Sequence, residues 1–258
     1  KPALALTGRL RLIPGQQDVP VIAEANGPSS DAAMPNELKH ACRVRVLHTG
    51  GSVTPDGDCL VFDGCDSLTL LLAARTDYAP DYQANWRGQP PAPVVAQDIA
   101  AAEAKSFEAL RQAHLDDLAT LLGRVRVVWG RSDAATLALP TDQRLAAYAQ
   151  GASDPDLEQT MFQYGRYLLA SCSRPGGLPA NLQGLWNDSN KPAWASDYHS
   201  NINVQMNYWG AEPTALPECH QPLLDFVTAC AEPCRIATRK AFGENTRGWT
   251  ARRRPGRM

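Results

Sequence analysis

The segment NLQGLWNDSNKPAWASDYHSNINVQMNYW (residues 181–209) contains three of the chain's six tryptophans, together with six asparagines, two aspartates and a histidine. It has few aliphatic residues, so an ordinary amphipathic helix or buried strand is not expected over most of its length. An amide offers a donor and an acceptor to neighbouring hydroxyl groups, and an indole offers a flat apolar surface. This mixture of side chains is typical of a sugar-binding surface.

The end of this segment, HSNINVQMN (199–207), alternates polar and apolar residues. On a helix, Asn201 and Asn203 would point about 200° apart, whereas in an extended chain they point to the same side. We therefore predict an extended stretch with one side on a cavity wall and the other buried in the core. The polar side carries His199, Asn201, Asn203, Gln205 and Asn207, and the apolar side carries Ile202, Val204 and Met206. The structural alternative is a plain loop with Asx turns that its aromatic rings pin to the core.

Composition and charge bound the class of protein. The chain has 258 residues, 44% of them hydrophobic and 20% charged, as expected for one large or two modest globular domains. Its net charge of −2 favours neither nucleic acid nor an anionic membrane as a partner. No run of apolar residues is long enough to predict a transmembrane helix. The opening KPALALTGRLRLIPG has no initiator methionine and no signal-peptide pattern, so we expect that Lys1 is not the natural start.

Cysteine spacing predicts no metal site. The seven cysteines lie at positions 42, 59, 65, 172, 219, 230 and 234. Cys230 and Cys234 have a CxxxC spacing, but neither a second pair nor a nearby histidine completes a zinc ligand set. We predict free or buried thiols and no metal or organic cofactor.

The first part of the chain has the pattern of β-structure. Short runs within residues 1–79 alternate in polarity and are separated by turn signals such as Gly50-Gly51. Arg43 and Arg45 alternate with valines, which predicts a sheet with one wet face and favours a sandwich. Residues 80–95 are rich in proline and glutamine and are expected to form a loop or linker.

The rest of the chain has mostly helical spacing. A helical pattern runs from about residue 96 and is expected to end at Gly123, and RVRVVWG (124–130) then predicts a short strand. Further helices are expected with Thr141 as an N-cap and with Pro155 near a start. Residues 217–243 predict two helical stretches that break at Pro233. One helix after another is compatible with a helical barrel.

The residues of the tryptophan-rich segment also carry a family resemblance. The sequence SRPGGLPANLQGLWNDSNKPAWASDYHSNINVQMNYWGAE (173–212), followed by ECHQPLLDFV (218–227), closely resembles the catalytic domain of glycoside hydrolase family 95. This family comprises bacterial and plant α-L-fucosidases and some α-L-galactosidases. HACRVRVLHTGG (40–51) and SFEALRQAHLDDLATLLGRVRVVWG (106–130) extend the resemblance upstream, so it covers about residues 38–249.

The resemblance implies an α+β multidomain fold with an N-terminal β-sandwich, a helical linker, an (α/α)6 barrel and a small C-terminal β domain. Residues 1–79 would be the end of the sandwich, and residues 80–140 the loop and helical linker. Residues 141–249 would be the start of an incomplete barrel, and residues 250–258 an aberrant basic tail.

The resemblance also implies a mechanism, in which the anomeric configuration of the sugar is inverted. Asn201 and Asn203 match an NxN motif that helps to polarise the attacking water, together with an aspartate. His199 is similar to a residue that contacts the sugar. From residue chemistry alone, flat apolar surfaces for the sugar ring could come from Trp186, Trp194, Tyr198, Tyr208 and Trp209. Of these we assign Trp194 and Trp209 to the substrate site. The family's general acid and its partner aspartate lie further along than this chain runs, and neither Glu212 nor Glu218 matches the acid.

The expected substrate is a terminal α-L-fucosyl or α-L-galactosyl group of an oligosaccharide or glycan, with no nucleic acid or membrane partner. The tail after Trp249, TARRRPGRM, departs from the family and is interpreted as a shifted reading frame or truncated product; a nucleic-acid or lipid patch is the alternative. We therefore expect the isolated chain to be poorly soluble and inactive. The competing hypotheses are a non-catalytic carbohydrate-binding fragment and a structural module. A periplasmic or secreted location is expected for the parent enzyme.

Overall fold

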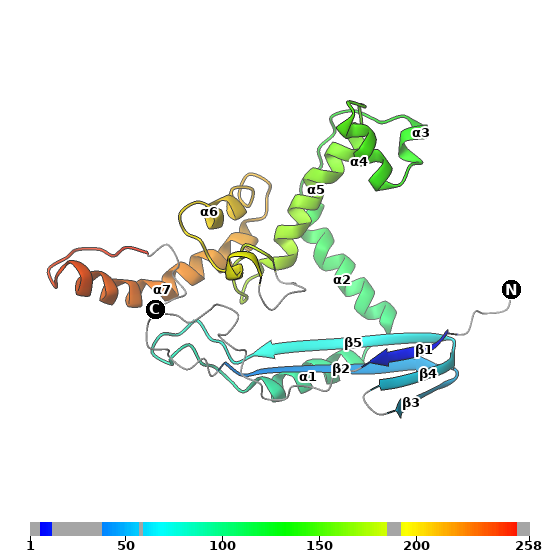
Figure 1. Cartoon of the computed structure of the whole chain (residues 1–258), viewed down its shortest axis with the longest axis horizontal. Coiled ribbons are helices and arrows are strands. Elements are labelled where there is room, and N and C mark those ends of the chain that lie inside the picture. Colours follow the sequence, from blue (N-terminus) through cyan, green and yellow to red (C-terminus); the bar gives the residue numbers. More distant parts are fainter. Residues whose placement is uncertain (1–5, 12–37, 57–58, 185–191, 252–258) are drawn as a thin grey trace. The chain divides into compact units, whose positions relative to one another are not determined.

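The computed structural model describes residues 6–11, 38–56, 59–184 and 192–251 (Figure 1). The chain divides into two compact units, Lys1–Ala113 and His114–Met258. The first unit contains small antiparallel sheets and a helix, whereas the second is helical in its described part. The fold is therefore mixed α and β, as the sequence predicts.

Two sheets make up the β-structure of the first unit. Its strands are β1 (Leu6–Arg11), β2 (His40–Thr49), β3 (Ser52–Asp56), β4 (Cys59–Cys65) and β5 (Ser67–Thr76). One sheet has the order β1-β4-β3, and β2 pairs with β5 as a long antiparallel ribbon. The predicted turn at Gly50-Gly51 connects β2 to β3, and both glycines have positive φ angles, of 63° and 55°. A Cβ atom on Gly51 would lie 2.2 Å from the Asp63 carbonyl oxygen, so the turn needs glycine.

Helix α1 (Pro91–Glu103) lies along the β2–β5 ribbon (Figure 1). It covers the side that carries the arginines: Arg45 pairs with Glu103 at 2.7 Å, and Arg75 pairs with Asp98 at 3.0 Å. On the opposite side, Leu72 is 56% exposed. The predicted alternation is therefore present, but the helix lies on the side expected to face water, where its carboxylates pair with the two arginines.

The second unit is built from helices around a small core. Helix α2 (Phe107–Leu122) leads into it and is followed by Gly123, as predicted. Its other helices are α3 (Ala134–Leu137), α4 (Thr141–Ala149), α5 (Pro155–Cys172), α6 (Asn203–Tyr208) and α7 (Pro217–Phe242). The core joins the ends of α2 and α5 to α6 and the start of α7, through residues that include Leu121, Leu169, Val204, Tyr208 and Leu216.

The strand predicted at residues 124–130 is wrong, because no strand forms there. Side chains of α5 bond this segment's backbone instead of a neighbouring strand. Gln163 donates to the Val125 carbonyl at 2.6 Å, and the Trp129 amide donates to Gln159 at 2.7 Å. These glutamines lie four residues apart on α5, so one helical face satisfies a backbone that alternation alone assigns to a sheet.

Two predicted helix boundaries are also wrong. The N-cap of α4 is Pro140, and Thr141 is the first helical residue. Helix α7 does not break at Pro233 but continues through both Pro222 and Pro233. Each proline removes one backbone hydrogen bond, yet both rings are buried on the face that packs against the rest of the unit. Packing of that long face therefore outweighs the lost bonds.

Buried thiols lie on this face of α7. Phe226, Cys230 and Cys234 form a cluster against Tyr198 and Trp249. All seven cysteines are free, and burial raises the pKa of the Cys230 thiol to about 11. The prediction of free or buried thiols is therefore confirmed.

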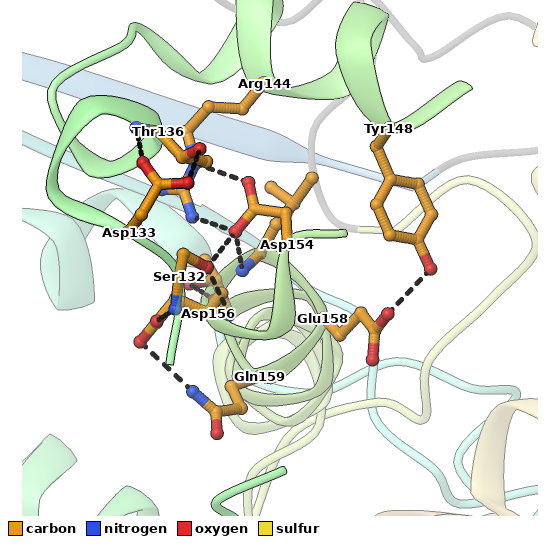
Figure 2. Close-up of polar contacts among 11 residues, drawn as sticks. Ser132, Asp133, Thr136, Arg144, Tyr148, Asp154, Asp156, Glu158 and Gln159 are labelled. Carbon is orange, nitrogen blue, oxygen red and sulfur yellow. Dashed lines mark hydrogen bonds and ion pairs between the residues drawn. The ribbon is translucent and has the colours of Figure 1, made fainter. Parts of the chain in front are cut away.

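A polar cluster fixes the start of α5 (Figure 2). Asp154 is 2% exposed and caps the helix by accepting from the Leu157 amide at 3.1 Å. The same carboxylate accepts from Ser132 at 2.6 Å and from Arg144 at 2.8 and 2.7 Å. Asp156 accepts from the Ser132 amide at 2.6 Å. This start, at Asp154-Pro155, agrees with the sequence prediction.

Two ion pairs predict how stability depends on pH. The Arg144 guanidinium lowers the pKa of Asp154 from 3.8, and Arg124 lowers that of Glu218 from 4.5 to about 2. Because both folded-state pKa values are depressed, the stabilisation is complete above the ordinary values and is lost as the pH falls below them. We expect Tm to fall between about pH 5 and pH 2, and the slope to flatten in Asp154→Asn. An unchanged slope in that variant would contradict this prediction.

Candidate active site

A buried chain of hydrogen bonds holds the loop that follows α5. The Ala180 amide donates to the Tyr208 hydroxyl at 2.7 Å, and that hydroxyl lies 2.7 Å from Ser173 Oγ. Ser173 in turn donates to the Cys219 carbonyl at 2.7 Å. Asn207 adds a bond from its Nδ2 to the Ala180 carbonyl at 3.2 Å. Helix α6 thereby fixes the loop against the end of α5 and the start of α7.

The extended conformation predicted for residues 199–207 is wrong. A turn leads into α6, which begins at Asn203, and the Val204 amide bonds the His199 carbonyl at 3.1 Å. The predicted apolar side is not buried as a set, because Val204 is enclosed while Met206 is 52% exposed. Val204 and Tyr208 are both buried at a spacing of four residues, which is the helical signal that the alternation obscured.

His199 is enclosed where this turn begins. It is 5% exposed, and its Nδ1 lies against Oδ1 of Asp197. The Trp194 indole meets the His199 ring edge to face, with ring centres 5.8 Å apart and planes at 82°. The structure therefore gathers an indole, an imidazole and a carboxylate over six residues of chain.

Asn201 and Asn203 follow directly. Asn201 is exposed in the turn, and Asn203 is half-buried as the first residue of α6. Within the described part of the chain, no side-chain hydrogen bond engages either amide. No described residue therefore competes with a water molecule or a ligand for either amide.

Comparison with known proteins assigns the family. Residues 106–255 match the sequence model of the Glycosyl hydrolase family 95 catalytic domain, which is more than half of the chain. The chain belongs to glycosyl hydrolase family 95. It is 35% identical over 220 residues to the probable alpha-fucosidase A of Aspergillus niger, covering 80% of this chain and 27% of that protein. It is also 36% identical over 212 residues to the alpha-L-fucosidase 2 of Arabidopsis thaliana, covering 81% of this chain and 25% of that protein.

A third relative of this family 95 chain is the probable alpha-fucosidase A of Aspergillus oryzae. The two are 38% identical over 170 residues, which is 59% of this chain and 22% of that protein. The chain thus spans about a quarter of the length of the curated relatives it matches. The family is one of glycosidases, and the resemblance that the sequence suggested is confirmed.

The aromatic residues of the family 95 segment divide into two groups. Tyr198 and Tyr208 belong to the core: Tyr198 packs on Phe226 with ring centres 4.7 Å apart, and Tyr208 is 5% exposed. Trp194 and Trp209 are 67% and 62% exposed. Only the latter two present the open indole faces that the sequence predicts, and Trp186 lies outside the described residues.

Among the described residues, Trp194 is the one of these two tryptophans that has a ring contact with His199. Trp194 contacts His199 and has a φ of +56°, a strained conformation for a bulky side chain. Trp209 is the C-cap of α6 and, among the described residues, has no ring contact with Trp194 or His199. The structure thus places Trp194 against His199, and Asn201 and Asn203 follow His199 in the turn and at the start of α6.

Sequence reasoning missed Asp197 as a member of this group. Its signal was the spacing of two residues between an aspartate and a histidine that a short loop can bring together. The 3₁₀ helix Ala193–Ser196 ends directly before Asp197 and turns the chain so that the carboxylate meets the imidazole.

The described residues contain no group of three His, Cys, Asp or Glu side chains placed to hold a metal ion. None of the helices in the described ranges combines the length and apolar character that crossing a membrane requires.

Replacing Tyr208 with phenylalanine is expected to lower the free energy of unfolding by about 1–3 kcal/mol, because the Ala180 amide would lose its buried partner. Chemical denaturation of the family 95 chain measures this loss. Tyr148→Phe is a matched control, since that hydroxyl bonds Glu158 at an exposed position. Equal losses in the two variants would contradict a special role for the buried hydroxyl.

Proposed function

We propose that this chain provides the water-binding side of an inverting glycosidase that removes terminal α-L-fucosyl groups, or α-L-galactosyl groups, from oligosaccharides or glycans. One observation carries the proposal: the amides of Asn201 and Asn203, which no described residue engages, follow the enclosed His199 by two and four residues in the chain. The names of the relatives, which are alpha-fucosidases, support the choice of sugar.

In inverting hydrolysis, one carboxylic acid protonates the leaving oxygen while a base activates water on the opposite face of the sugar. A neutral amide is a weak base, but its carbonyl oxygen accepts a hydrogen bond from water and orients it. We assign this role to Asn201 and Asn203. His199 contacts a sugar hydroxyl, and Trp194 and Trp209 offer apolar faces to the pyranose.

The nearby glutamates do not provide the general acid in this proposal. A general acid must hold its proton near the working pH. Arg124 lowers the pKa of Glu218 to about 2, so that carboxyl is ionised at neutral pH. Glu212 lies 3.0 Å from Nδ1 of His220, outside the group around His199.

The larger architecture belongs to the same proposal. Residues 1–79 form the end of a β-sandwich, residues 80–140 a loop and helical linker, and residues 141–249 the start of an (α/α)6 barrel. Uncovered apolar side chains support the barrel, since packed helices bury such faces. Met161 on α5 is 74% exposed, and Leu224 on α7 is 50% exposed.

Two measurements test the function. Calorimetric titration of the 258-residue chain with L-fucose tests sugar binding. Hydrolysis of 4-nitrophenyl α-L-fucoside is then followed in a chimera, in which the matched 80% of this chain replaces the corresponding part of the Aspergillus niger relative. We expect binding by the chain and release of β-L-fucose first by the chimera, as seen by proton NMR. Hydrolysis that releases the α-anomer first would refute inversion.

The unmodified Aspergillus niger relative is the control for hydrolysis. Sugar binding by the chain, together with a folded chimera that does not cleave the fucoside, would favour the carbohydrate-binding alternative. If neither binding nor hydrolysis is observed, the segment is a structural loop and the proposed function is refuted.

A further inference from the structure

The Asp197–His199 pair differs from an ordinary surface ion pair. The Asp197 side chain is 21% exposed and the His199 side chain 6% exposed. Nδ1 of His199 is fully enclosed, and Oδ1 of Asp197 is the polar atom that lies against it. The small exposed part of the imidazole therefore does not lie at Nδ1. Any ligand that reaches a ring nitrogen must approach Nε2.

The carboxylate constrains the ring's proton. A neutral imidazole carries one N–H and one lone pair, on different nitrogens. A lone pair on Nδ1 would face the carboxylate's own lone pairs in an enclosed setting, where such repulsion is strong. A proton on Nδ1 turns this repulsion into attraction. The neutral ring then has its free lone pair on Nε2.

We propose that Asp197 is a positioning residue, which holds His199 as the Nδ1–H tautomer so that Nε2 accepts a hydrogen bond from a sugar hydroxyl. This inference rests on the proposed function. A protonated Nε2 would instead demand an acceptor from the ligand. Asp197 thus determines that the site favours a hydroxyl able to donate at this position.

The neighbouring backbone supports a built arrangement. Trp194 and Ser196, which both lie in the 3₁₀ helix before Asp197, have φ angles of +56° and +53°. Such backbone conformations are strained for residues other than glycine and persist where the surroundings hold them. The Trp194 indole packs edge to face on the imidazole, so the ring is held by the indole as well as by the carboxylate at Nδ1.

The chain contains a matched pair for comparison. His220 Nδ1 lies 3.0 Å from Glu212 Oε1, and the His220 ring stacks on Tyr208 with centres 5.5 Å apart. The Glu212 side chain is 60% exposed, against 21% for Asp197. Glu212→Gln therefore removes a carboxylate from a histidine without touching the enclosed pair.

The test uses the 258-residue chain with 15N-labelled histidine. Long-range 1H–15N spectra report which ring nitrogen carries the proton, and His199→Gln assigns the signals. We expect the Nδ1–H tautomer for His199, and a mixture of tautomers in Asp197→Asn. That variant should bind L-fucose about tenfold more weakly, which is the lower end of the 10–100-fold loss seen when metal-ligating histidines lose an orienting carboxylate. Glu212→Gln should change neither readout.

An Nε2–H tautomer of His199 in the unsubstituted chain would overturn the proposal. This test does not depend on whether Asp197→Asn folds. Unchanged tautomer and affinity in a folded Asp197→Asn would also overturn it, while the proposed function would stand. Failure of the unsubstituted chain to bind L-fucose would count against the proposed function. The tautomer of His199 would still test whether Asp197 positions the ring.

Discussion

Replacing Asn201 and Asn203 together with alanine is expected to reduce fucoside turnover by about 100-fold or more in the chimera described above. The reason is that their carbonyl oxygens orient the attacking water, so the loss falls on the transition state. KM should change little, because an interaction made only in the transition state does not contribute to ground-state binding. Steady-state kinetics with 4-nitrophenyl α-L-fucoside separate kcat from KM.

The control for this pair is Gln205→Ala. Gln205 carries the same amide group on α6 but bonds the Ser200 carbonyl at 2.7 Å from an exposed position. It should keep nearly full turnover. Because Asn201 is exposed and neither asparagine amide is engaged by the described residues, the double variant should also unfold at nearly the same temperature. A large loss of stability with unchanged turnover would assign both residues to packing.

Replacing Arg166 with methionine is expected to lower the free energy of unfolding by about 3 kcal/mol or more, because hydrogen bonds to charged groups contribute about 1.5–3 kcal/mol each. Arg166 is 3% exposed and donates to the Leu121 carbonyl at 2.9 Å and to the Leu122 carbonyl at 2.8 Å. It also reaches Val125 at 3.3 Å and Thr214 at 3.1 Å. One guanidinium thus caps α2 and joins it to α5 and to the loop before α7.

Urea denaturation measures this loss, and Arg111→Met is its matched control on α2. Arg111 pairs with Glu108 at 2.9 Å, but the two side chains are 52% and 69% exposed. Exposed pairs of this kind contribute less than about 1 kcal/mol. Similar losses for Arg166→Met and Arg111→Met would refute the capping role.

Local signals in the sequence predicted the elements whose ends depend on neighbouring residues. Pro155 after Asp154 marks the start of α5, Gly123 follows α2, and Gly50-Gly51 provides the turn between β2 and β3. Each signal acts through the backbone of its own few residues, so no tertiary contact is needed to read it.

Elements set by distant contacts were not predictable in this way. The segment after Gly123 alternates like a strand, but its hydrogen bonds come from Gln159, Gln163 and Arg166 on α5. Helix α7 keeps Pro233 because the buried face of the helix outweighs one lost bond. The spacing of apolar residues along the sequence does not report hydrogen bonds or packing from distant parts of the chain.

The candidate site shows the same division. Its residue types indicated sugar chemistry, and the motif indicated His199, Asn201 and Asn203, whose roles stay predictions. The helix that begins at Asn203 was missed, because the alternation of NINVQMN competes with the spacing of Val204 and Tyr208. The contact between Asp197 and His199 depends on the strained turn before it, which no local preference predicts.

Alkylation of the buried thiols of α7 can report local opening of this helix. Cys230 is 4% exposed and Cys234 is 2% exposed, and both lie against Phe226. The thiolate is the form that alkylating reagents attack, and the raised pKa of Cys230 keeps it scarce while the helix is closed. The rate at which these two cysteines are alkylated therefore measures how often this part of α7 opens and exposes its buried face, independently of any sugar or substrate.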